Sequence, residues 1–97
     1  MLSSHERAQI KSKISMQASV CFVGKEGLTE NVIKSIGQAL DAREGIKISL
    51  LQNCDIDVKE FANVICESLN ADIVGMVGRK VIIYRYNPNA TKHLLDN

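Results

Sequence analysis

The stretch Val20–Thr29, with the sequence VCFVGKEGLT, gives the strongest indication of the fold. Its first four residues are apolar, which is typical of a short buried strand. The segment Gly24-Lys25-Glu26-Gly27 interrupts the apolar run, and Thr29 is a residue type that often caps the start of a helix. The stretch therefore predicts a strand, a glycine-containing loop and a helix in direct succession.

The GxxG loop, residues 24–27, has three features that suit a phosphodiester backbone. Its two glycines let the main chain turn sharply and approach a ligand closely. The amides at the start of the following helix attract anions, and Lys25 adds a mobile positive charge. KH domains grip nucleotide backbones with a loop of this kind. The alternative is an ordinary tight turn with an exposed lysine, which Glu26 favours because its carboxylate repels phosphate.

Helix and strand patterns continue on both sides of this loop. Ser3 and Glu6 have the spacing of a capping box and predict a helix from about Ser4 to Ser15. Gly45 predicts the end of the second helix, and Ile46–Leu51 predicts the second strand. The second helix has one apolar face, formed by Val32, Ile33, Ile36 and Leu40.

The remaining third of the chain predicts a third helix and a hairpin. Asp57 and Glu60 repeat the capping-box spacing, and Asn70 is suited to the left-handed end of the helix. Pro88 indicates a turn that closes the folded core. The inward stripe of the helix is Phe61, Ala62, Ile65 and Leu69, and the hairpin strands are Ile73–Val77 and Lys80–Tyr86, joined by Gly78-Arg79.

The order α-β-α-β-α-β-β predicts an α/β fold, a two-layer sandwich with a mixed four-stranded sheet. Helices that cross between strands imply parallel pairing, and the closing hairpin adds an antiparallel pair. The 97 residues suit one domain, 1–97, with a short tail from about residue 88.

Composition excludes several classes of protein. The charge balance is +2 over residues 1–48 and −1 over residues 49–97, so any nucleic-acid site is a local patch on a chain of net charge +1. The polar residues 1–13 contain no signal-peptide core, and no apolar run is long enough to span a bilayer. We therefore expect a cytoplasmic protein without membrane contact, and we expect it to be a monomer.

Catalysis and metal binding have little support. The three cysteines are widely spaced and odd in number, which favours reduced structural thiols over a disulfide framework or a reactive thiol. The loop fits neither GxxxxGK[ST] nor GxGxxG, and the two histidines lie near the chain ends. We expect no catalytic residue, metal or cofactor.

Further basic residues could extend a binding patch around the loop. Arg7 and Lys11 lie four residues apart on the first helix, and Arg79 and Lys80 lie at the hairpin turn. Solvated surface charge is the alternative for each. Alternation places Tyr84 and Tyr86 on one face of the last strand, where they could stack on bases, although packing is the more common role of such tyrosines.

Several separated motifs together resemble the CRM domain, and more closely its bacterial YhbY-like single-domain members. They are VGKEGLT, Ala42-Arg43-Glu44 followed by Ile46-Lys47-Ile48, Val77-Gly78-Arg79 and Ile83-Tyr84-Arg85, and the resemblance extends from about Arg7 to Pro88. The chain departs from the family pattern at Ser19, where many members have proline, and at Gly45, which replaces a larger apolar residue.

The resemblance implies a fold similar to the carboxy-terminal domain of a bacterial translation initiation factor, and it implies RNA binding. For bacterial members it implies association with precursor large ribosomal subunits, while plant relatives serve in organellar intron splicing. Carried over by motif, Gly24, Lys25, Glu26 and Gly27 form the family's RNA-contacting loop. Arg7, Lys11, Arg79 and Lys80 are a looser transfer to the adjoining basic surface.

Three functional hypotheses follow. The first is an RNA-binding accessory factor in large ribosomal subunit assembly, whose partner is precursor large-subunit ribosomal RNA, with ribosomal proteins as further contacts. The second is a protein-interaction module that docks on ribosomal or other proteins without direct RNA contact. The third, an enzyme acting on a phosphorylated small molecule, requires a pocket with converging polar groups beside the GxxG loop, and the sequence offers no such set.

Overall fold

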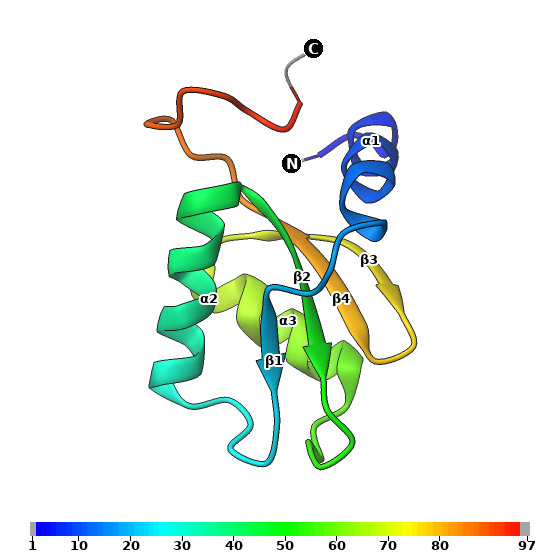
Figure 1. The fold of residues 1–97 in the computed structure, drawn as a ribbon, viewed down its shortest axis with the longest axis vertical. Helices are drawn as coiled ribbons and strands as arrows, with labels where there is room; N and C mark the ends of the chain where they lie inside the picture. The colour runs from blue at the N-terminus through cyan, green and yellow to red at the C-terminus, as the bar shows by residue number, and fades with distance from the viewer. Residues whose placement is uncertain (1, 96–97) are drawn as a thin grey trace.

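The elements follow one another in the predicted order α-β-α-β-α-β-β (Figure 1). The structure, a computed structural model, describes residues 2–95, and within this range there are three helices and four strands. The helices are α1 (Ser4–Ser15), α2 (Glu30–Arg43) and α3 (Val58–Leu69). The strands are β1 (Cys21–Val23), β2 (Gly45–Leu50), β3 (Asp72–Val77) and β4 (Lys80–Tyr84).

The strands form one mixed sheet in the order β1-β2-β4-β3. β1 and β2 pair in parallel because α2 crosses between them, and β2 pairs antiparallel with β4. β3 and β4 form the predicted antiparallel hairpin, whose register shifts between Ile73 and Gly75. The predicted mixed α/β fold with a four-stranded sheet is therefore confirmed.

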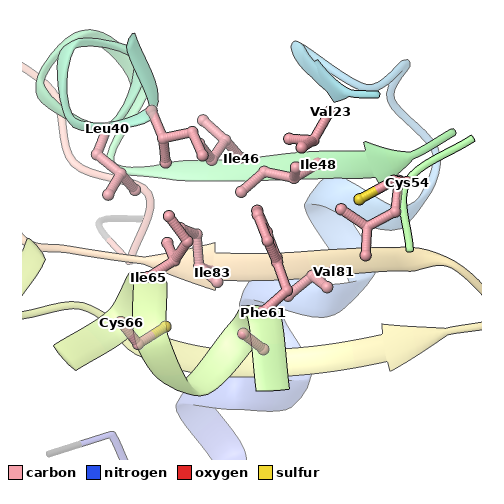
Figure 2. Packing of buried hydrophobic residues seen from close by; sticks show 13 residues of the cluster. Val23, Leu40, Ile46, Ile48, Cys54, Phe61, Ile65, Cys66, Val81 and Ile83 are labelled. Carbon is pink, nitrogen blue, oxygen red and sulfur yellow. The ribbon is translucent and has the colours of Figure 1, made fainter. Parts of the chain in front are cut away.

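The main core lies between the sheet and helices α2 and α3. Figure 2 shows side chains of the two helices meeting those of β2 and β4, with Phe61 of α3 among them. The phenyl ring of Phe61 is fully buried, and its removal would leave a large void. Cys54 and Cys66 also belong to this core, and burial raises the pKa of the Cys66 thiol to about 11. Both cysteines are free thiols, as expected for structural positions.

A second, smaller core lies on the opposite face of the sheet. Ile10 and Ile14 of α1 pack there on Ile82 and Tyr84 of β4, and all four side chains are buried. The two-layer description is therefore incomplete, because α1 adds a partial third layer. Only two residues of α1 are buried, so its periodicity gave little indication of the face that it covers.

The ends of the helices largely follow the sequence rules. At the start of α3 the Asp57 side chain accepts from the amides of Lys59 and Glu60, without the return bond from Glu60 that would complete the predicted capping box. The capping box of Ser3 and Glu6 is formed in both directions, and Asn70 ends α3 in the left-handed conformation with φ 54°. Gly45 was predicted to stop α2, but the residue with positive φ is Glu44, at φ 64°, and Gly45 begins β2. The helix therefore ends just before Gly45, as predicted, but the positive φ falls on Glu44, which contacts of its own side chain hold in this strained conformation.

Glu44 is a buried carboxylate that fastens the C-terminal segment to the domain. Its exposed fraction is 2%, and its two oxygens accept hydrogen bonds from the amides of Asn87 and Leu94, each at 2.9 Å. The Nδ1 atom of His93 lies 2.6 Å from the same carboxylate. Pro88 therefore does not close the folded core as predicted, because the chain returns beyond it and seats Leu94 against the smaller core.

The hydrogen bonds to Glu44 determine its ionisation. Burial would raise the pKa of this carboxyl, but the hydrogen bonds from Asn87, His93 and Leu94 together outweigh burial and lower the pKa below its usual range. A lowered pKa means that the folded state favours the charged form, so the charge stabilises the fold above the pKa of an unfolded glutamate. That contribution is lost as the pH falls through the lowered pKa of the folded state.

Replacing Glu44 with Gln should lower the stability at pH 7 by about 1–3 kcal/mol, because the three donors lose their charged acceptor. The difference from the unmodified protein should shrink as the pH falls towards 3. Thermal unfolding followed by circular dichroism between pH 7 and 3 measures both effects. Glu67→Gln, on the exposed surface of α3, is the control. A deficit that stays constant over this range would contradict the role of the Glu44 charge.

Candidate nucleic-acid interface

Three loops meet at one end of the sheet, and we call residues 24–29, 51–57 and 78–79 the loop end. The amide of Leu51 donates to the carbonyl of Val23 at 2.8 Å, which joins the first loop to the second. The amide of Leu50 donates to the carbonyl of Arg79 at 2.8 Å, which brings in the hairpin turn. In Figure 1 the first two loops lie together at the bottom, below β1 and β2, and α1 lies at the opposite end.

Both glycines of the GxxG loop lie close to other side chains of the loop end. Gly27 has φ +63°, a conformation that favours glycine, and a Cβ there would lie 3.1 Å from Cδ1 of Ile56. Gly24 is buried, and a Cβ on it would lie 3.2 Å from Oδ1 of Asn53. The glycines therefore have a structural reason to be present that does not depend on a ligand.

Two of the four amides of the GxxG loop are already engaged within it. The amide of Gly24 donates to Oε1 of Glu26 at 3.2 Å, and the amide of Gly27 donates to the carbonyl of Gly24 at 3.1 Å. Thr29 donates to the carbonyl of Gly27 at 3.2 Å. Among residues 2–95, the amides of Lys25 and Glu26 form no such bond, so they are the loop amides that could meet an anion.

Glu26 thus braces the loop, although its charge opposes phosphate. Its side chain accepts a hydrogen bond from the Gly24 amide while remaining exposed, and Glu26 is one of the residues that line a groove beside β1 and α2. Lys25 is exposed at the tip of the loop and forms no salt bridge within the described part of the chain. The loop therefore presents one cation and one anion on a rigid turn.

The two basic residues of the hairpin turn differ in role. Arg79 donates to the carbonyls of Leu51 at 3.2 Å and Cys54 at 2.6 Å, which ties the hairpin to the second loop. Lys80 is exposed at the start of β4 and lies on the sheet face that carries α1. Lys80 is therefore the cation that is more available to a ligand, and Arg79 holds the hairpin turn against the second loop.

The basic residues of α1 lie farther away. Lys11 lies beside β3, because its Cδ is 3.4 Å from the position of a Cβ built on Gly75. Arg7 follows Glu6, which lines a hollow together with Asp72 and Tyr84 at the far end of the sheet. The fold thus places Lys25 and Arg79 at the loop end and Lys80 directly after it in β4, whereas Arg7 and Lys11 lie outside the loop end.

Other basic and aromatic residues proved to have structural roles. Lys47, within the Ile46-Lys47-Ile48 motif, donates from Nζ to the carbonyls of Ser15 and Gln17, each at 2.7 Å, and ties the end of α1 to the sheet. Tyr84 is buried in the smaller core, and Tyr86 stacks on the ring of His93 with centroids 4.5 Å apart. Neither tyrosine is at the loop end.

Arg85 likewise closes the opposite end of the main core. Its guanidinium donates to the carbonyls of Leu69 at 2.8 Å and Gly37 at 3.1 Å, and it pairs with Asp41 at 2.8 Å. The Ile83-Tyr84-Arg85 motif is therefore explained by packing and by this clamp between α2, α3 and β4.

Phe22 is the aromatic residue that sequence reasoning missed. It lies in β1 two residues before the GxxG loop, and 60% of it is exposed. Its apolar neighbours suggested a fully buried strand, whereas only Val23 of β1 is buried. The strand pattern alone gave no sign of which face α1 leaves uncovered.

Among residues 2–95, no group of three or more His, Cys, Asp or Glu side chains is placed to hold a metal ion. No helix within the same range has the length and apolarity needed to cross a membrane.

Comparisons with known proteins agree on the family. The model of the CRS1/YhbY (CRM) domain matches residues 2–85. The probable RNA-binding protein YqeI of Bacillus subtilis is 34% identical over 85 residues, with 88% of each chain covered. The probable RNA-binding protein PA4753 of Pseudomonas aeruginosa is 30% identical over 93 residues, covering 96% of this chain and 89% of that protein.

A solved structure supports the same assignment. The solution structure of the hypothetical protein SAV1595 from Staphylococcus aureus matches with a TM-score of 0.80 at 33% identity, covering 95% of both chains. The motifs at residues 24–27, 46–48 and 83–85 all lie within the range that the family model matches. The chain belongs to the CRS1/YhbY (CRM) domain family.

Proposed function

We propose that this protein binds structured RNA through its loop end and that its role is binding rather than catalysis. The observation that carries the proposal is Lys25, exposed at the tip of an internally braced GxxG loop. A braced loop loses little conformational freedom when a ligand binds, so more of the attraction to phosphate remains as affinity. The names of two relatives, both called RNA-binding proteins, support the same class of ligand.

Phosphate is bound in this proposal by the Lys25 ammonium and by the amides of Lys25 and Glu26. Lys80 adds a second cation on the adjoining sheet face, while Arg79 holds the second loop in place. Contacts of this kind position an RNA without reading its sequence. Affinity should therefore depend on salt and on RNA shape.

The finer part of the proposal concerns the cell. We propose a cytoplasmic, monomeric accessory factor that contacts precursor large-subunit ribosomal RNA during assembly, with ribosomal proteins as further contacts. The support is the resemblance to bacterial YhbY-like proteins together with a phosphate-binding loop that lacks base-reading side chains of its own. Shape recognition suits a large, folded RNA better than a short linear motif.

Replacing Lys25 with Gln should weaken binding to a structured RNA several-fold and reduce the salt slope of log K by about one, because one phosphate contact is lost. Gel shifts between 50 and 200 mM salt measure both quantities. Arg43→Gln, at the far end of α2, removes one charge elsewhere and should leave the affinity nearly unchanged. Equal losses in the two variants would point to net charge rather than to the loop.

Replacing Glu26 with Gln should raise the affinity by about two- to fivefold at low salt, because a like charge beside phosphate is removed while the amide-accepting oxygen remains. The gain should disappear at high salt. Fluorescence anisotropy with a labelled RNA hairpin measures it, and Glu67→Gln on α3 is the control. A lower affinity for Glu26→Gln would show that phosphate does not approach this loop.

In a cell lysate the tagged protein should sediment with precursor large subunits at low salt and leave them at high salt. Sucrose-gradient fractions, analysed by immunoblotting and RNA sequencing, test this assembly role. The Lys25→Gln variant should shift towards the top of the gradient. Co-sedimentation that survives both high salt and Lys25→Gln would instead indicate docking on ribosomal proteins.

A further inference from the structure

A row of residues crosses the sheet next to the GxxG loop. In the strand register Phe22 is paired with Ser49, Ser49 with Lys80, and Lys80 with Val77. Directly paired residues of neighbouring strands point to the same side of a sheet. The next residue along each of β1 and β4, Val23 and Val81, belongs to the main core, so the row faces away from α2 and α3.

This row is the part of the α1 face that α1 leaves uncovered. Ile10 and Ile14 of α1 cover Ile82 and Tyr84, farther along β4. Phe22 is 60% exposed and Val77 is 61% exposed, whereas Ser49 between them is buried and hydrogen-bonded to Ser19. Two apolar side chains therefore stand in solvent on either side of a small polar pair.

The charges around the row suit a nucleic acid. Lys80 lies in the row, and Lys47 lies in the next row along the sheet, paired with Ile82. These two rows contain no carboxylate. A groove of about 230 Å³, lined by Ser15, Lys47, Val77, Lys80 and Ile82, opens on the same face. Exposed apolar surface bordered by lysine is complementary to a base joined to a phosphate.

Phe22 lies close enough to both Lys80 and Lys25 for one strand of RNA to contact all three residues. Two strand spacings, about 10 Å, separate the backbones of Phe22 and Lys80. Three residues, at most about 11 Å of extended chain, separate Phe22 from Lys25. A nucleotide lying on Phe22 would thus have lysines within reach on both sides.

We infer that Phe22 stacks on an unpaired base of the RNA whose phosphate is bound at the GxxG loop. This inference rests on the proposed function and names the class of RNA feature that the site selects, namely a bulged or single-stranded nucleotide. Aromatic side chains on a sheet bind unpaired bases through their faces, and such stacking tolerates any base. Lys25 and Lys80 hold the flanking phosphates, so recognition combines backbone contact with the availability of an unpaired base.

The test compares Phe22→Leu, which keeps an apolar side chain but removes the aromatic face, with the unmodified protein. The probes are an unstructured 12-nucleotide RNA and a 12-base-pair RNA duplex. Phe22→Leu should weaken binding to the single strand about tenfold and leave duplex binding nearly unchanged. Val64→Ala, an exposed apolar position on α3 at the other face of the sheet, should change neither.

A second variant provides a direct signal. Phe22→Trp would introduce the single tryptophan of the chain, since the sequence contains none. Stacking should quench its fluorescence when the single strand is added, and the duplex should not. Phe22→Trp should also bind the single strand at least as tightly as the unmodified protein.

The outcomes separate this inference from the proposed function. If Lys25→Gln weakens binding to both probes but Phe22→Leu does not, the stacking role is overturned and the phosphate-binding loop stands. If the unmodified protein binds neither probe, both fail. If sedimentation shows that the protein alone dimerises and Phe22→Leu makes it monomeric, the face pairs two copies of the chain, and the inference is overturned.

Discussion

The burial of β4 on both faces is the constraint on which the rest of the structure depends. Val81 and Ile83 point into the main core with α2 and α3, while Ile82 and Tyr84 point towards α1. A strand buried on both sides must be central, so β4 lies between β2 and β3 and leaves β1 as an edge. Because α1 covers only the Ile82–Tyr84 half of its face, the half of the sheet beside the loop end stays open. Lys80 and Phe22 are exposed because one short helix is too small to cover this face of a four-stranded sheet.

Element order, most boundaries and the mixed sheet could be predicted from the sequence, because capping residues and apolar periodicity are local signals. The side of the sheet that α1 covers could not be predicted, since it depends on long-range packing of two isoleucines. The same limit applies to the candidate site. The GxxG loop was visible as a motif, but the engagement of its amides by Glu26 and by its own carbonyls depends on the folded turn. Arg79 was predicted to be an RNA-contacting cation, and only the folded structure shows that its guanidinium donates to the carbonyls of Leu51 and Cys54.

Glu44 and Gly45 show how a local rule can fail for a tertiary reason. A glycine after a helix usually takes the residue position with positive φ, yet here Glu44 has the positive φ, at a cost that its buried hydrogen bonds offset. Gly45 is needed for a different purpose, because a Cβ on it would collide with the side chain of Leu94. The space that a side chain at position 45 would need is thus filled by Leu94 of the returning C-terminal segment. The packing of residues beyond Pro88 could not be predicted from local patterns, because their partner Glu44 lies more than forty residues earlier in the chain.

In the GxxG loop the glycines serve the packing of the loop, whereas the side chains around them serve the proposed binding of RNA. Gly24 and Gly27 are explained by the close approach of Asn53 and Ile56 and by one positive φ, so a GxxG motif alone is weak grounds for ligand binding. What distinguishes this loop is its position. It follows an edge strand whose exposed phenyl ring shares a row with Lys80, and its tip carries Lys25. A chain of net charge +1 cannot attract RNA over its whole surface, so affinity has to come from a few cations placed beside an apolar base-binding face. Such a site favours RNA that is folded enough to present its phosphates and open enough to offer an unpaired base.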